Sequence, residues 1–148
     1  MQKILVFIFL SVLFSKEAFS ENNYFLMLKN NKVHVRYGPG FDYPIIYIYK
    51  KKFLPIKVID KKENFRRIID LKNNSGWIHT SQLRKGKSFI LLEDQLLFSK
   101  PKKYSRPILK ILKGRLLLVK KCKNEWCRVK TDKYIGWLET KNVWGNIN

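Results

Sequence analysis

The sequence is poor in the residues that build catalytic and metal centres. Its 148 residues include two Cys, two His and 11 Asp or Glu, and the acidic residues form no dense cluster. His34 and His79 lie far along the chain from Cys122 and Cys127, so neither a zinc-binding spacing nor a thiol with a nearby base is present. We therefore expect no catalytic residues, no metal site, no cofactor and no enzymatic activity. The protein is expected to be a binding or structural protein.

Long apolar runs are also absent. The longest, Ile4–Phe14, has 11 residues, whereas a transmembrane helix needs roughly 20. This run follows Lys3 and precedes the small residues of Ala18–Ser20, a pattern typical of a secretory signal peptide over residues 1–20. The sequence thus predicts no transmembrane anchor, a mature chain starting near Glu21, and a periplasmic or secreted protein.

Acidic residues are outnumbered by 31 Lys and Arg, which gives a formal net charge of +20. The excess is shared, with +10 on residues 21–87 and +9 on residues 88–148. Such a field attracts polyanions. However, 24 of the basic residues are Lys and the chain is rich in Ile and Asn, as expected from an AT-rich genome, so we favour compositional drift. Predicted export further argues against nucleic acid as the partner.

The two cysteines flank a polar turn between two β-rich runs. A hairpin would bring Cys122 and Cys127 face to face, and an exported protein meets an oxidising compartment. We predict a disulfide between them. The enclosed loop is short, so the bridge would fix the turn more than it would stabilise the whole domain.

A unit of about sixty residues occurs twice, since residues 33–83 and 95–143 align. The clearest match joins Gly76-Trp77-Ile78 to Gly136-Trp137-Leu138. The other matched pairs are Val35–Pro39 with Leu97–Pro101, Tyr43–Ile46 with Arg106–Leu109 after one inserted residue, Phe53–Ile56 with Arg115–Leu118, and Asn64–Ile68 with Glu125–Val129. The chain is therefore expected to hold two copies of one domain.

Both copies consist of short β-branched or aromatic runs separated by turn residues, which predicts an all-β fold of small antiparallel barrels. The expected strands are Phe25–Leu28, Val33–Arg36, Ile45–Tyr49, Leu54–Ile59, Phe65–Asp70, Gly76–His79, Phe89–Leu92, Gln95–Phe98, Ile108–Leu112, Leu116–Lys120, Trp126–Lys130 and Tyr134–Leu138. The polar segment Arg84–Lys87 is expected to link a first barrel, residues 21–87, to a second, residues 88–148.

The run Val33–Pro44, with its Arg-Tyr-Gly-Pro-Gly segment, resembles the bacterial SH3 (SH3b) family when combined with Asn64–Ile68 and Gly76–His79. The second copy is similar to the second half of exported proteobacterial proteins with two SH3-like units, although Lys100-Pro101-Lys102 replaces Gly-Pro-Gly. The resemblance implies two tandem SH3-like barrels that act as non-catalytic modules and often recognise peptidoglycan peptides. Gly38 and Gly40 are expected to allow the positive φ of a tight loop.

Aromatic side chains of the first copy are candidates for a ligand groove, because flat rings bury area with little loss of entropy. The aromatics considered are Tyr37, Phe41, Tyr43, Tyr47, Tyr49 and Trp77. Along Ile45–Tyr49 the isoleucines and tyrosines alternate, so Tyr47 and Tyr49 lie outside if the isoleucines point inward. The predicted ligand-binding residues are Tyr37, Tyr43, Tyr47, Trp77 and His79.

The leading hypothesis is an exported binding module for peptidoglycan or another anionic cell-envelope polymer. The alternative is a structural or scaffold protein that meets a periplasmic protein through edge-strand pairing or charge.

Overall fold

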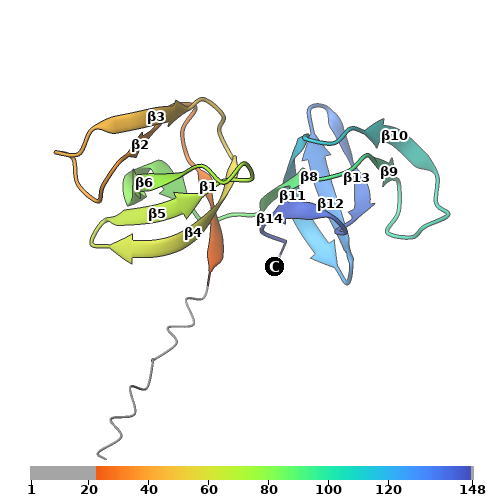
Figure 1. Cartoon of the computed structure of the whole chain (residues 1–148). Helices are drawn as coiled ribbons and strands as arrows, with labels where there is room; N and C mark the ends of the chain where they lie inside the picture. Colours follow the sequence, from red (N-terminus) through yellow and green to blue (C-terminus); the bar gives the residue numbers. More distant parts are fainter. Residues whose placement is uncertain (1–22, 148) are drawn as a thin grey trace, which may run out of the picture.

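The computed structural model describes residues 23–147 and contains two antiparallel seven-stranded sheets that form barrels lying side by side (Figure 1). The predicted signal peptide, residues 1–20, lies outside the described residues. The first barrel, residues 24–84, holds β1 (Tyr24–Leu28), β2 (Val33–Arg36), β3 (Ile45–Tyr49), β4 (Pro55–Lys62), β5 (Phe65–Ile69), β6 (Ser75–His79), the short 3₁₀ helix η1 (Thr80–Gln82) and β7 (Leu83–Arg84). The second barrel, residues 88–145, holds β8 (Ser88–Leu91), β9 (Gln95–Phe98), β10 (Pro107–Ile111), β11 (Leu116–Lys123), β12 (Trp126–Thr131), β13 (Tyr134–Glu139) and β14 (Val143–Gly145).

The two barrels have the same topology. Their strand orders are β3-β2-β6-β5-β4-β1-β7 and β10-β9-β13-β12-β11-β8-β14, so each strand of the second matches the strand seven places earlier. The all-β prediction is confirmed, and all twelve expected strands are present, three with the expected ends and nine with ends shifted by one to three residues. Strands β7 and β14 were not predicted, because their two and three residues are too few to show an alternating pattern.

Each barrel has its own core, and no residue belongs to both. The residues at the centre of the first are buried aliphatic side chains from six strands: Leu28, Val33, Val35, Ile56, Val58, Ile68, Ile78 and Leu83. The second core repeats this pattern with Phe89, Leu91, Leu97, Ile111, Leu117, Cys127, Val129 and Leu138. Gly76 and Gly136 occupy the same position in the two barrels, each against the core. A Cβ on Gly76 would meet Val35 and the Arg36 carbonyl, and one on Gly136 would meet Leu97 and the Phe98 carbonyl.

The register of the repeat differs from the sequence alignment at two points. Ile45 pairs with Arg36 as Pro107 pairs with Phe98, so the loops before β3 and β10 have equal length and no residue is inserted. Pro55 pairs with Met27 as Leu116 pairs with Ile90. Both alignment errors arose where residue types alone were matched, because strand register is determined by cross-strand pairing.

The predicted disulfide is confirmed. Cys122 and Cys127 are directly opposite each other on β11 and β12, with Cα atoms 4.0 Å apart. The equivalent pair in the first barrel is Lys61 and Arg66, two like charges. The second barrel therefore has a covalent link where the first has none.

Replacing both cysteines by Ser is expected to lower the free energy of unfolding of the second barrel by about 2 kcal/mol, the loop-closure entropy of a six-residue ring. Amide hydrogen exchange should then rise on β11 and β12 while β4 and β5 keep their protection. Equal loss of protection in both barrels would contradict a local role for the bridge.

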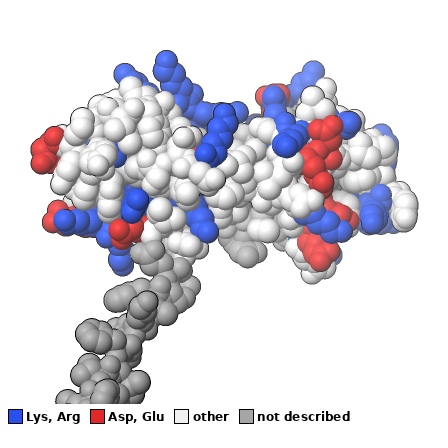
Figure 2. Space-filling view, in the orientation of Figure 1, with Lys and Arg blue, Asp and Glu red and all other residues white. Residues whose placement is uncertain are grey.

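The barrels contact each other through a few specific groups. The hydroxyl of Ser88, which is buried, donates a hydrogen bond to the Phe53 carbonyl over 2.8 Å. The rings of Phe25 and Trp144 meet edge to face with centroids 5.2 Å apart. Lysine and arginine side chains are scattered over both barrels on the face shown in Figure 2, with no single basic patch.

Candidate functional site

The candidate site lies on the outer face of β2, β6 and β5, which are neighbours in the first sheet. Trp77 on β6 pairs with Arg36 on one side and Arg67 on the other, so these three side chains lie in a row. Trp77 and His79 alternate with Gly76 and Ile78, which are buried, and are themselves half-buried. The structure thus presents the predicted Trp77 and His79 on one face, beside two arginines.

The loop between β2 and β3 is closed by Arg36. Its Nη1 donates hydrogen bonds to the carbonyls of Tyr43 (2.7 Å) and Phe41 (3.1 Å), and the guanidinium lies 5.4 Å from the Phe41 ring centroid. The Tyr37 N–H also donates to the Pro44 carbonyl. The loop is therefore held as a compact unit with Tyr37 and Phe41 exposed at 73% and 65%.

The two glycines of this loop serve a different purpose from the one predicted. Neither Gly38 nor Gly40 has a positive φ. Instead, a Cβ on Gly38 would overlap the ring of Tyr43, and one on Gly40 would overlap the Asp42 carboxylate and lie 3.2 Å from Tyr43 Cδ2. Gly occupies both positions because the Tyr43 ring and the Asp42 carboxylate need the space, and Tyr43 itself is 39% exposed.

Three rings gather at the end of this face. Phe41, Phe65 and His79 have centroids 5.0–5.3 Å apart in every pair. His79 Nδ1 accepts a hydrogen bond from the Ser81 backbone N–H (3.2 Å), which fixes the imidazole at the start of η1. Phe41 covers Phe65, which is only 5% exposed. We call Arg36, Phe41, Phe65, Trp77 and His79 the aromatic surface.

Tyr47 lies on the inner face of β3, whereas the prediction placed it on the outer face. Ile45, Ile46 and Ile48 are exposed at 43%, 44% and 38%, whereas Tyr47 and Tyr49 pack against the core. Burial raises the pKa of the Tyr47 hydroxyl. Alternation identified two faces of β3 correctly but not which one turns inward.

The Tyr49 hydroxyl donates a hydrogen bond to Asp70 over 2.9 Å, and burial raises its pKa well above the ordinary value of 10.0. Tyr49 is thus a structural residue.

Arg36, Phe41 and Phe65 were not among the predicted site residues. Phe41 was among the aromatic residues considered for a groove. The sequence feature that pointed to it as a site residue was its position in the loop after Arg36, three residues beyond Gly38. Phe65 is separated from Phe41 by 24 positions, so only the fold brings the two rings together.

The second barrel carries a changed version of this surface. Trp137 pairs with Phe98, which occupies the place of Arg36, and Trp126 opposite Glu139 replaces Phe65 opposite His79. Lys103 stands at the position of Phe41. A hollow of about 220 Å³ opens here, with Phe98, Lys103, Trp126 and Glu139 in its lining. The aromatic surface of the first barrel is therefore not duplicated.

Sequence comparison agrees with this architecture. The sequence profile of the bacterial SH3 domain matches residues 29–85 and 93–145. The chain belongs to the bacterial SH3 domain family. Each bacterial SH3 domain of the chain corresponds to one of the two barrels.

No curated protein matches the chain in sequence. Among solved structures, the chain is similar to NlpC2 from Trichomonas vaginalis, with 13% identity, a TM-score of 0.39 and coverage of 84% of this chain and 48% of that one. The corresponding values for NlpC1 from Trichomonas vaginalis are 14%, 0.38, 93% and 51%. The chain spans about half the length of each.

Within residues 23–147, no group of three or more His, Cys, Asp or Glu side chains is arranged to hold a metal ion. Nor does this part of the chain contain a helix long and apolar enough to cross a bilayer.

Proposed function

We propose that the protein is an exported, non-catalytic binding module that recognises cell-envelope material, with a peptidoglycan peptide as its ligand. The observation that carries this proposal is the aromatic surface of the first barrel. It combines exposed Phe41 with half-buried Trp77 and His79 on a rigid sheet. The Cys122–Cys127 disulfide supports a site of action outside the cytoplasm.

The chemistry of this surface suits a short peptide with free carboxylates. The rings of Phe41, Trp77 and His79 provide flat apolar contact area at little cost in side-chain entropy. Arg36 and Arg67 on either side of Trp77 provide positive charge for carboxylates. Tyr37 and Tyr43 belong to the loop that carries Phe41 and are exposed, whereas Tyr47 packs against the core and is not assigned a ligand contact.

Sedimentation with purified peptidoglycan tests this function. The chain should be retained at about 0.5 M salt, where charge alone is screened. Trp77→Ala should reduce retention about tenfold, the effect of losing a central aromatic anchor. Trp137→Ala, the equivalent change in the second barrel, is the matched control and should retain binding, and amide exchange should show that both variants stay folded.

Two results would contradict the aromatic surface as the binding site. Retention that disappears at high salt and does not depend on Trp77 would indicate charge alone. Equal losses for the two tryptophan variants would indicate that the difference between the barrels has no bearing on binding.

A second candidate function is favoured by β3. This strand lies at the edge of its sheet and exposes Ile45, Ile46 and Ile48. An exposed apolar edge can pair with a strand of another protein, so the alternative is a scaffold protein with a periplasmic protein partner. Absence of retention on peptidoglycan at any salt concentration would favour this function.

A further inference from the structure

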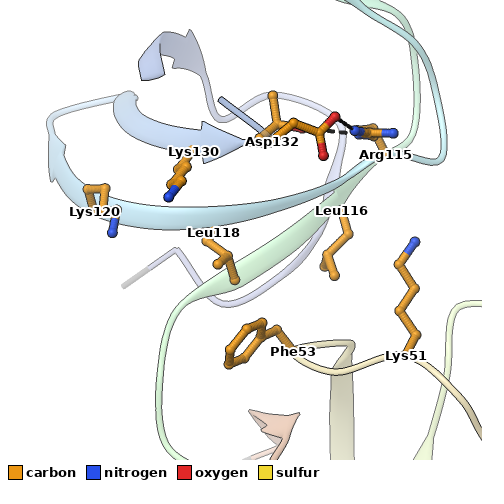
Figure 3. A pocket seen from close by; sticks show the side chains of 9 residues that line it. Lys51, Phe53, Arg115, Leu116, Leu118, Lys120, Lys130 and Asp132 are labelled. Carbon is orange, nitrogen blue, oxygen red and sulfur yellow. Dashed lines mark hydrogen bonds and ion pairs between the residues drawn. The ribbon is translucent and has the colours of Figure 1, made fainter. Parts of the chain in front are cut away.

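A cavity of about 410 Å³ lies between the two barrels (Figure 3). One wall is the outer face of β11 and β12, where Leu116, Leu118 and Lys120 alternate along one strand and Lys130 pairs with Leu118. The other wall is the loop before β4, which contributes Lys51 and Phe53. This volume falls in the range of roughly 300–1,000 Å³ typical of small-ligand sites.

The cavity is strongly positive. Arg115 is paired with Asp132, and its Nε also donates to Thr131 over 3.0 Å. Lys51, Lys120 and Lys130 have no acidic partner among residues 23–147, which leaves three uncompensated charges around one space. Figure 3 shows Lys51 and Arg115 on one side of the apolar residues and Lys120 and Lys130 on the other. The basic groups therefore lie on either side of the apolar residues Leu116, Leu118 and Phe53.

Phe53, on the wall formed by the loop before β4, has a strained backbone conformation. Its φ is 66°, whereas the equivalent residue of the second barrel is Gly114, with a φ of 84°. Their equivalence follows from the hydrogen bonds, since the N–H of Phe53 donates to the Leu28 carbonyl as that of Gly114 donates to the Leu91 carbonyl. A bulky residue at positive φ costs of order 1–3 kcal/mol, and such strain is concentrated at functional sites. The first barrel thus places a ring where the second has only a turn.

We propose that this cavity binds a phosphorylated saccharide, with phosphate groups at its two basic sides and the sugar ring on Phe53. Three unpaired ammonium groups nearly balance a ligand with two phosphate groups, which carries about three to four negative charges at pH 7. The Lys52 ammonium and the Arg84 guanidinium already lie over the Phe53 ring, 5.0 Å and 5.8 Å from its centroid, but neither residue lines the cavity. The part of the ring that lines the cavity would receive the C–H groups of the sugar, because the face of an aromatic ring is electronegative. This site is separate from the aromatic surface and shares no residue with it.

Calorimetric titration of the chain from Glu21 onward, which carries every described element, tests the proposal with glucose 1,6-bisphosphate as the probe. Binding should be about tenfold tighter than for glucose 6-phosphate, and glucose without phosphate should not bind. Amide NMR shifts should fall on residues 51–53, 115–120 and 130–132. The double variant Lys120→Gln, Lys130→Gln should bind the bisphosphate about tenfold more weakly.

The matched control is Lys61→Gln, Lys62→Gln, which removes the same charge from exposed positions on β4 outside the cavity. Its affinity should change by less than about twofold. Phe53→Gly, which adopts the backbone of Gly114 without strain, should weaken the bisphosphate about fivefold and leave inorganic phosphate unchanged.

Several outcomes would overturn the proposal. Equal losses in the two lysine pairs would show that net charge alone binds the probe. Equal affinities for inorganic phosphate and the bisphosphate would show that the saccharide does not contribute to binding. Binding to phosphatidylglycerol vesicles without binding to the soluble bisphosphate would indicate a membrane surface instead, and NMR shifts confined to the aromatic surface would place the ligand elsewhere.

Discussion

Replacing Gly76 by Val is expected to unfold the first barrel and leave the second folded. A Cβ at this position would overlap Val35 and lie 3.1 Å from the Arg36 carbonyl and 3.2 Å from the Ile46 Cδ1. Overpacking a core costs typically 1–3 kcal/mol and occasionally more, and since Val adds two further carbons against backbone atoms, we expect a loss above about 3 kcal/mol. A domain of about sixty residues has a total stability of roughly 3–9 kcal/mol, so the loss is comparable to the whole.

Amide exchange measures this result separately for each barrel. In Gly76→Val, protection should disappear from β2, β5 and β6 and persist on β9, β12 and β13. Gly136→Val should give the converse, because its Cβ would be 2.7–2.9 Å from Leu97, Phe98 and Ile108. Gly114→Ala is the control. Nothing lies within 4 Å of that Cβ, so only its positive φ matters and the expected cost is about 1 kcal/mol. Protection retained on β6 in Gly76→Val would show that the first barrel can absorb the added side chain.

Replacing Asp70 by Ala should destabilise the first barrel by about 3 kcal/mol, because it removes the charged acceptor of four partly buried hydrogen bonds. Asp70 is only 8% exposed. Its carboxylate accepts hydrogen bonds of 2.8–2.9 Å from the Tyr49 hydroxyl, the Lys72 N–H, and both the backbone N–H and the side-chain amide of Asn74. These bonds tie the turn after β5 to β3. Urea unfolding followed by tryptophan fluorescence and amide exchange would measure the loss.

Asp70 also predicts a pH dependence. Burial raises the pKa of this carboxyl, but the hydrogen bonds from Asn74, Tyr49 and Lys72 together outweigh burial and hold the pKa below its usual value of 3.8. The stabilisation is therefore fully present above pH values near 3.8 and is lost as the pH falls through the lower pKa of the folded state. Asp70→Asn should remove this part of the acid loss. An unchanged pH profile in that variant would mean that other carboxylates account for the whole effect.

The doubling of the domain and nearly all of its strands could be predicted from local signals. Gly76-Trp77 and Gly136-Trp137 fix the register of the repeat because a buried close approach accepts only Gly at that point. The disulfide was predictable because two cysteines five positions apart on either side of a polar turn lie opposite each other in a hairpin. The alignment failed by one residue before β3 and β4, where no such steric marker exists.

The candidate site was only partly predictable. Trp77 and His79 share a face because they are two residues apart on a strand, and this could be predicted from the sequence alone. The contact of Phe41 with Phe65 and His79 depends on how the loop closed by Arg36 folds back over the sheet. Tyr47 was placed on the wrong side for a related reason: its strand offers two apolar faces, and the choice depends on how the strand packs on the core.

The sequence by itself determined that there are two copies of an all-β domain, where most strands lie, and which cysteines pair, because each of these follows from contacts between near neighbours or from repetition. Only the tertiary structure decided that Gly38 and Gly40 make room for Tyr43, that the aromatic surface exists on one barrel and not the other, and that basic residues surround a cavity between the two. These features join Phe53 to Leu118 and Phe41 to His79 across long stretches of chain, and such contacts depend on packing in three dimensions.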